Sequence, residues 1–213
     1  TINSVLCQTY TELEIVIVDN NSTDKTWHII NSFADSRIKK YKNDNNIGMV
    51  RNWNRCIEYS TGEYIHFLCG DDIILPDCIE KKIEKIKEND DISMVFSASD
   101  VIDTTGKIVL HRSYKKKDTI LDGLTLAKKS FMTKNLYGEP SNVLFRKSLL
   151  KKTGFFPVNV KYSIDWDLWI RLSCQGKVAF IAKTLMKYRI SKSNGTSSFD
   201  IKAFVADDKV FVD

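Results

Sequence analysis

The stretch that decides the fold is LEIVIVDNNSTDKTWHIINSFA, residues 13–34. Its first eight residues form a continuous run rich in β-branched side chains, typical of a strand buried on both faces of a parallel sheet. The residues that follow carry apolar side chains at helical spacing, and Ser22 or Thr23 is the expected N-cap of that helix. A buried strand followed directly by an amphipathic helix predicts an α/β fold.

The alternation of strands and helices continues through the first half of the chain. RIKKYKN (37–43) and GEYIHFLCG (62–70) are predicted strands, and residues 49–59 and the segment after Pro76 are predicted helices. Three strand–helix units in succession predict a doubly wound, mostly parallel sheet flanked by helices. Ligands of such sheets bind at the carboxyl ends of the strands, where the connecting loops converge.

The second half of the chain has a different pattern. Its predicted elements are a hairpin (92–103 and 107–110), two helices (near 121–132 and 164–176) and two strands (141–147 and 178–190). No repeat or linker separates the halves, so we expect a single domain of 213 residues.

Composition excludes several classes of protein. The chain is 43% hydrophobic and 28% charged, typical of a globular domain, and no apolar run approaches the about 20 residues of a membrane span. Five cysteines without a CxxC pair and three dispersed histidines argue against structural zinc or a disulfide framework, so we expect a reducing cytoplasm. The net charge of +5 includes lysine clusters, among them Lys81, Lys82, Lys85 and Lys87, which are typical of solvated helix faces and are also compatible with an anionic membrane face. Aromatic residues are not interleaved with these clusters, which disfavours nucleic-acid binding.

Carboxylates follow the ends of three predicted strands. Asp19 ends the first, Asp44 follows the second, and Asp71 and Asp72 end the third. The two adjacent carboxylates repel each other unless a cation lies beside them. A divalent cation with phosphate oxygens would relieve that repulsion; alternatively, Asp72 caps a turn while Asp71 points to water.

Two further segments carry candidate functional groups. Arg51 lies in the first turn of a predicted helix, where it can meet a phosphate or remain solvated. Asp165 and Asp167 flank Trp166 near another helix N-terminus. There an ionised Asp165 could be a general base toward a hydroxyl, or simply a first-turn acid that favours the helix.

Four blocks in this order resemble the family 2 glycosyltransferases of the GT-A fold. They are SVLCQTYTELEIVIVDNNSTDKT, NNIGMVRNWNRCIEYSTGEYIHFLCGDD, GEPSNVLFRK and YSIDWDLWIRL. The resemblance implies an inverting transferase that uses a nucleotide-diphosphate sugar and a divalent cation, Mn²⁺ or Mg²⁺. It also implies a nucleotide-sugar-binding half at 1–91, an acceptor-binding half at 92–190 and a C-terminal tail at 191–213.

The resemblance also assigns roles to individual residues. Asp165 corresponds to the catalytic base, and Asp71 and Asp72 correspond to the metal-binding pair. The residues implied for the nucleotide sugar are Asp19, Asn21, Asp44, Arg51 and Asp71. Those implied for the acceptor are Glu139, Trp166 and Asp167.

The sequence departs from the family pattern at several points. Cys69, Ile164 and Ser191 replace an aspartate, an acid and a histidine that the family often has. The chain begins at Thr1, after the point where family members have a first strand and a nucleotide-contacting loop. We expect the full-length protein to carry that strand between the strand ending at Asp19 and the one ending at Cys69, because its loss leaves two strand edges unpaired.

The expected function is therefore sugar transfer from a nucleotide-diphosphate donor, most simply a UDP-sugar, to a hydroxyl of a saccharide or lipid-linked acceptor. A role in bacterial polysaccharide biosynthesis, in the cytoplasm or at the inner membrane face, follows from the same resemblance. Two alternatives remain. One is a nucleotidyltransferase, for which no glycine-rich basic loop is visible. The other is a catalytically silent binding domain of a polysaccharide assembly complex.

Overall fold

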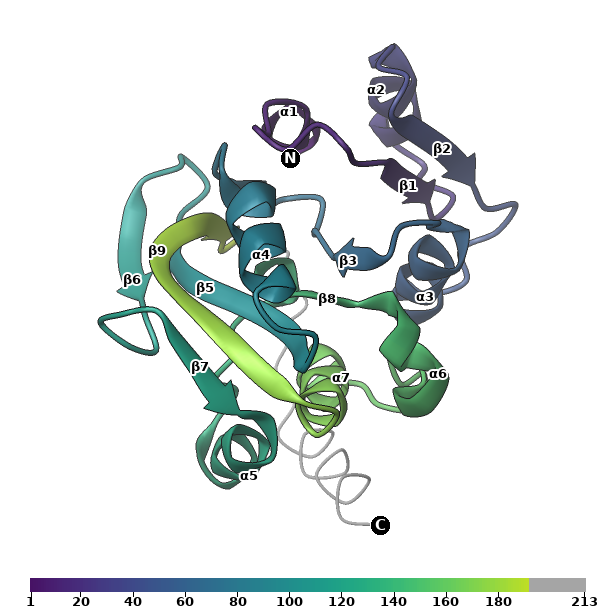
Figure 1. Ribbon diagram of the computed structural model, residues 1–213. Coiled ribbons are helices and arrows are strands. Elements are labelled where there is room, and N and C mark those ends of the chain that lie inside the picture. The colour runs from purple at the N-terminus through teal and green to yellow at the C-terminus, as the bar shows by residue number, and fades with distance from the viewer. Residues whose placement is uncertain (192–213) are drawn as a thin grey trace.

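The computed structural model describes residues 1–191, and strands and helices alternate through its first half as the sequence predicts (Figure 1). The helices are α1 (Ile2–Leu6), α2 (Thr26–Ser32), α3 (Met49–Tyr59), α4 (Cys78–Lys87), α5 (Gly123–Thr133), α6 (Leu150–Thr153) and α7 (Ile164–Ser173), with 3₁₀ turns η1 (Pro140–Asn142) and η2 (Lys147–Leu149). The strands are β1 (Ile15–Asp19), β2 (Ile38–Lys42), β3 (Tyr64–His66), β4 (Ile73–Ile74), β5 (Ile92–Ile102), β6 (Ile108–Arg112), β7 (Thr119–Asp122), β8 (Leu144–Arg146) and β9 (Lys177–Arg189).

The strands form two sheets. β1 and β2 pair in parallel, and the larger sheet has the order β3-β8-β5-β9-β4, with β6 added to β5 and β7 added to β9. Its long central pair, β5 and β9, is parallel, while the other pairs of this sheet are antiparallel. The predicted α/β class with flanking helices is confirmed, and the second half contributes the antiparallel pairings.

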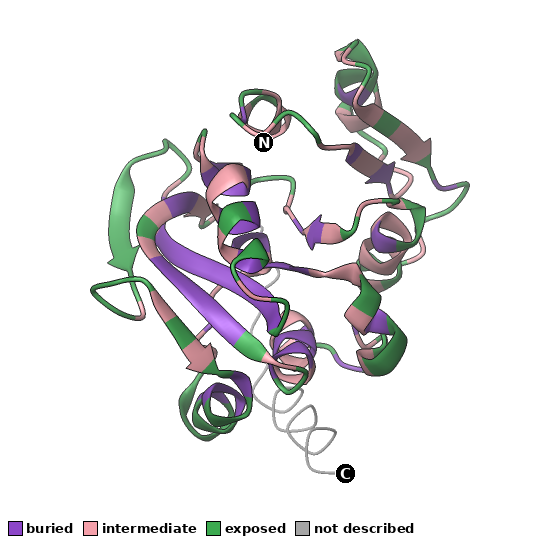
Figure 2. Ribbon diagram, in the orientation of Figure 1, coloured by how far each residue is buried: buried purple, intermediate pink, exposed green. Residues whose placement is uncertain are grey.

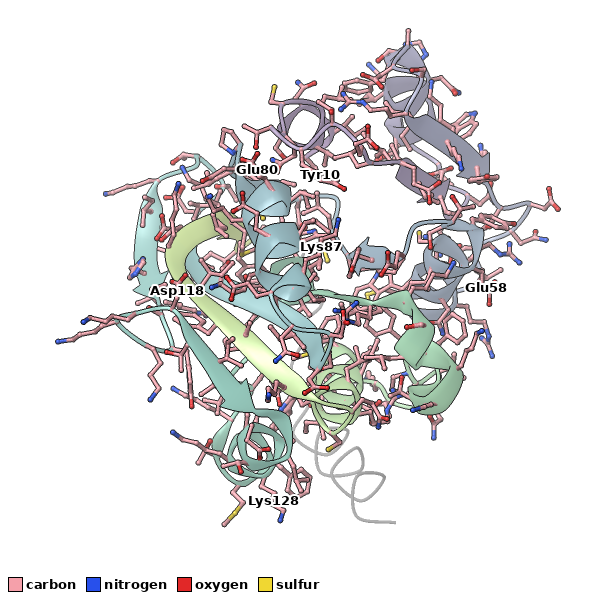
Figure 3. All side chains as sticks on the ribbon, viewed as in Figure 1. Tyr10, Glu58, Glu80, Lys87, Asp118 and Lys128 are labelled. Atoms are coloured by element: carbon pink, nitrogen blue, oxygen red, sulfur yellow. The ribbon has the colours of Figure 1, made fainter. Side chains whose placement is uncertain are left out.

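A wide gap separates the two sheets. β1 and β3 lie apart and are not hydrogen-bonded to each other (Figure 1). Residues of both strands line a cavity of about 1030 Å³. Apolar side chains of both strands line it, together with residues of α1, α3 and α4; Tyr10 and Lys87 lie at its edge (Figure 3).

The hydrophobic core is divided by the large sheet. One cluster packs α7 and α3 against the sheet around Trp169, Phe145 and Phe96, and a second cluster packs α4 against the other face around Ile86 and Val95. Burial is concentrated on β5 and β9, whereas the edge strand β6 is exposed along its whole length (Figure 2). The central strands therefore provide a rigid base for the loops at their carboxyl ends.

Some local predictions differ from the structure. The helix expected to begin after Ser22 or Thr23 begins at Thr26, with Lys25 at the N-cap position. The reason is that Ser22 is engaged by the Asp19 carboxylate instead of capping the helix. β7 was not predicted, and the helical spacing noted in the tail from 199 onward lies outside the described residues.

None of the helices within residues 1–191 has both the length and the hydrophobicity that crossing a bilayer requires.

Candidate functional site

Three of the predicted carboxylates come together around Cys69. Burial, followed by the negative charges of Asp72, Asp71 and Asp165, raises the pKa of the Cys69 thiol to about 12. Asp71 and Asp165 line the cavity together with Cys69. Residues almost 100 positions apart therefore share one acidic site beyond the carboxyl end of β3, and ligands of α/β sheets bind at the carboxyl ends of strands.

Asp72 is the enclosed member of this group. It is fully buried, and its two carboxylate oxygens accept hydrogen bonds from the Ser141 hydroxyl and from the backbone N–H of Arg189 (2.9 Å). Burial raises the pKa of Asp72 to about 6, although Ser141 and Arg189 oppose that shift. Both oxygens are thus committed to the protein.

Arg189 is the cation that the adjacent aspartates require. It ends β9, and its Nε donates to the carbonyl oxygen of Asp71 at 3.0 Å while its guanidinium attracts the Asp72 carboxylate. The sequence analysis did not single out Arg189, because nothing in the sequence places the end of β9 beside Asp72. The pairing of β4 with β9, Ile73 opposite Lys187, brings them together.

Asp71 is the open member of the pair. Its side chain is exposed, it lines the cavity, and among residues 1–191 no side chain or N–H donates a hydrogen bond to its carboxylate. Asp71 is therefore free to bind a ligand, whereas Asp72 fixes the local backbone.

Asp165 faces the same cavity from the first turn of α7. It follows Ser163, whose left-handed backbone (φ 55°) turns the chain into the helix. Burial raises the pKa of Asp165 to about 6, and the backbone N–H groups of Asp165 and Trp166 together with the Trp169 and Asn135 side chains oppose that shift. A carboxylate with such a pKa can accept a proton near neutral pH.

Asp19 ends β1 as predicted. It is 3% exposed, and its carboxylate accepts hydrogen bonds from the backbone N–H and hydroxyl of Ser22, which closes a tight turn. Asn21, within that turn, has a left-handed backbone (φ 60°), which asparagine tolerates better than most residues. Asp19 therefore shapes the loop after β1.

An asparagine network beside Asp19 was missed by the sequence analysis. Asn43 donates to Asn20 and Asn52 (3.0 and 2.8 Å) and accepts from Arg55 (2.7 Å), and Asn52 donates to the carbonyl of Val18 (3.0 Å). The network joins the loops after β1 and β2 to α3. The asparagine-rich segments NDNN and NWN were a signal for it, because amide side chains can both donate and accept.

Asp44 and Arg51 lie beside this network but outside it. Both are exposed, and neither makes a hydrogen bond or ion pair with another residue of the 1–191 range. Their assignment to the nucleotide stays a prediction.

The three residues predicted for the acceptor already have protein partners. Glu139 pairs with Arg112 on β6, and Asp167 accepts from Arg171 Nε at 2.8 Å. The Trp166 indole N–H donates to the Ser130 hydroxyl on α5 at 2.9 Å. These contacts hold the three side chains in place, and acceptor binding by these residues stays a prediction.

The described part of the chain contains no group of three or more histidine, cysteine, aspartate or glutamate side chains arranged to hold a metal ion. A metal bound here would depend on oxygen atoms from a ligand to complete its shell.

The fold and this acidic cavity define an α/β protein with carboxylates gathered beyond the end of β3. A family model, "Glycosyl transferase family 2", matches residues 1–154, and the chain belongs to that family. The GT-A-type fold is confirmed by S. aureus TarS in complex with UDP-GlcNAc, which matches with a TM-score of 0.75 at 20% identity over 94% of this chain and 56% of that one.

Relatives of similar sequence are named glycosyltransferases. An uncharacterized glycosyltransferase of Methanocaldococcus jannaschii is 33% identical over 196 residues, which is 89% of this chain and 64% of the relative. One from Haemophilus influenzae is 28% identical over 203 residues, 92% of this chain and 62% of the relative. The chain thus spans less than two thirds of the length of these relatives.

Proposed function

We propose that the protein is an inverting glycosyltransferase that moves a sugar from a nucleotide-diphosphate donor to an acceptor hydroxyl. The observation that carries this proposal is the convergence of Asp71 and Asp165 on one cavity, beside the buried Asp72–Arg189 pair. An open carboxylate and a carboxylate with a raised pKa give the site two distinct roles. Membership of glycosyl transferase family 2 supports the reaction class.

The proposed donor is a UDP-sugar. The structure of TarS with UDP-GlcNAc supports this choice, because that protein shares the fold over most of this chain. We assign the nucleoside to the loops after β1 and β2, near Asp19 and Asn21, and the diphosphate to the side of Asp71.

A divalent cation, Mn²⁺ or Mg²⁺, fits this donor set if the diphosphate supplies part of its shell. Asp71 offers an open carboxylate, and cations such as Mg²⁺ are commonly held by one or two carboxylates plus substrate phosphates. Asp72 would support the ion from behind, since its own oxygens are occupied by Ser141 and Arg189. When bound, the ion would neutralise negative charge that develops on the departing diphosphate.

Asp165 is the proposed general base. Its carboxylate lines the cavity at the N-terminus of α7, and its raised pKa suits proton transfer from a hydroxyl near neutral pH. The hydroxyl oxygen then attacks the anomeric carbon from the face opposite the diphosphate, the bond to the diphosphate breaks, and the proton stays on Asp165. A single displacement of this kind inverts the anomeric configuration.

The proposed acceptor is a saccharide or a lipid-linked saccharide in bacterial polysaccharide biosynthesis. Its side of the site is formed by the segment around Glu139 and by the first turn of α7 with Trp166 and Asp167. The lysine clusters support work in the cytoplasm at the inner face of a membrane, because anionic headgroups attract them.

The stereochemistry of the product tests this function. We expect the protein to release UDP from a UDP-α-sugar in the presence of acceptor and to form a β-linked product, which NMR identifies from the anomeric coupling constant. An α-linked product would contradict the single displacement. UDP binding without any turnover across a panel of saccharide acceptors would favour the silent binding domain instead.

A further inference from the structure

A buried lysine lies directly behind the acidic site. Lys82, on the inner face of α4, is completely buried, and no carboxylate within residues 1–191 forms an ion pair with it. Its Nζ lies 2.8 Å from the carbonyl oxygen of Asn142 and 3.2 Å from Nε2 of His66. Burying an amine without a carboxylate partner is costly, so an apolar residue would suit this face of the helix better.

The Cys78 thiol, on the same helix, also interacts with Lys82. The other two partners of Lys82, His66 and Asn142, lie where the chain after β3 and the chain before β8 separate. His66, at the end of β3, is paired with Leu144 of β8, and Asn142 is two residues before Leu144. Beyond His66 the chain runs to Cys69 and the aspartates. Before Leu144 it forms the turn η1, which contains Ser141. Lys82 thus contacts both segments, the end of β3 through His66 and η1 through Asn142, at the point where they separate.

Further along the same two segments, Ser141 of η1 contacts the loop that follows β3. Its hydroxyl accepts a hydrogen bond from the backbone N–H of Cys69 (2.9 Å) and donates one to the carboxylate of Asp72. The Asn142 side chain is fully engaged with Ser97 and with the carbonyl of Tyr137. The turn is therefore stiff, and a shift of its Asn142 end would carry Ser141 with it.

We propose that Lys82 is a positioning residue that holds η1 against the end of β3, so that Ser141 can bind both Cys69 and Asp72. The ammonium or amine donates to the Asn142 carbonyl, and Nε2 of His66 is the second acceptor. Burial and the neighbouring Lys82 hold the pKa of His66 well below its usual range, so its imidazole is neutral and can accept. The importance of this clamp for sugar transfer rests on the proposed function, but the clamp itself does not.

The reactivity of Cys69 measures the clamp independently of catalysis. Iodoacetamide labelling is followed by peptide mass spectrometry in wild type, Lys82→Met and Lys81→Met. Lys81 is a matched control, because its ammonium group lies at the surface of the same helix in an ion pair with Glu84. We expect Lys82→Met to raise the Cys69 labelling rate at least about tenfold, because release of Ser141 frees the backbone N–H of Cys69 and exposes this half-buried thiol further. Lys81→Met should leave the rate unchanged.

A double-mutant cycle separates positioning from general loosening. Ser141→Ala should raise Cys69 labelling as Lys82→Met does, and the double variant should be no more reactive than the faster single variant. An unchanged Cys69 rate in folded Lys82→Met, or multiplied effects in the double variant, would overturn the proposal. If Lys82→Met does not fold, NMR of ¹³Cε-labelled lysine tests whether Lys82 and Ser141 are coupled. The Lys82 signal is expected to shift in Ser141→Ala, and an unchanged signal would overturn the proposal.

A kinetic readout connects the clamp to sugar transfer. In Lys82→Met we expect kcat to fall together with the affinity for UDP, and Lys82→Arg, which keeps a donor, to recover part of both. A wild-type protein that does not transfer sugar would refute the proposed function while the Cys69 labelling still decides the role of Lys82. If Lys82→Met changed the Cys69 labelling rate but left kcat and UDP affinity unchanged, Lys82 would have a purely structural role, and its role in positioning the site for sugar transfer would be overturned.

Discussion

Replacing Asp165 with asparagine is expected to lower kcat by about 10²–10⁴-fold while leaving UDP affinity within about twofold of wild type. The amide has nearly the shape of the carboxyl group but cannot accept the proton of the acceptor hydroxyl, and loss of a general base has effects of this size. UDP release measures turnover, and calorimetric titration measures affinity. Glu58→Gln, the same chemical change on the exposed face of α3 (Figure 3), is the control.

The pH dependence of turnover also tests Asp165 as the general base. Asp165 must be ionised to act, and its pKa is raised to about 6, so kcat should fall as the pH drops through about 6 rather than through the ordinary aspartate range near 4. Asp72 titrates in the same range, so the acidic limb reports both groups. Near-normal turnover by Asp165→Asn, or activity that is constant down to pH 4.5, would refute the assignment of the base.

Replacing Asp71 with asparagine is expected to weaken UDP binding in Mn²⁺ at least tenfold and to leave binding without metal nearly unchanged. The reason is that Asp71 offers the open carboxylate of the pair, whereas both oxygens of Asp72 are occupied. Titrations of UDP with and without Mn²⁺ into wild type and Asp71→Asn measure the difference. Asp90→Asn, an exposed aspartate between α4 and β5, is the matched control.

A persistent Mn²⁺ effect in Asp71→Asn would contradict this role of Asp71. If Asp72→Asn removed the effect instead, the buried carboxylate would be the metal ligand, and its contacts with Ser141 and Arg189 would have to open when UDP binds.

Much of the fold could be predicted because the decisive signals are local. The β-branched run before Asp19 and the apolar spacing of α3 depend only on neighbouring residues, and α3 spans the predicted residues 49–59. The strand expected to run to Gly70 ends at His66, however. β8 offers only three residues to pair with it, and sequence alone does not show the length of a partner strand.

The carboxylates of the site could be predicted from the sequence, but their burial and their hydrogen-bond partners could not. Asp71, Asp72 and Asp165 were each identified from their positions at strand or helix ends. The difference between open Asp71 and buried Asp72 depends on Ser141 and Arg189, which lie 69 and 117 residues away from Asp72 along the chain. The pairing of Asp167 with Arg171 could have been found, since residues four apart on a helix are neighbours.

The buried Lys82 shows a further limit of sequence analysis. In the sequence it belongs to a lysine cluster that suggests a solvated helix face, whereas in the structure it points into the protein. The neighbouring Lys81 and Lys85 do pair with glutamates. Only tertiary packing distinguishes the one lysine that is buried.

The measurement that tests the central claim most directly is calorimetric titration of UDP into the protein with and without Mn²⁺, with GDP and dTDP as comparisons. If the acidic cavity is the donor site, UDP binds, Mn²⁺ strengthens its binding at least tenfold, and one base is preferred. Absence of binding by all three nucleotides would contradict the account.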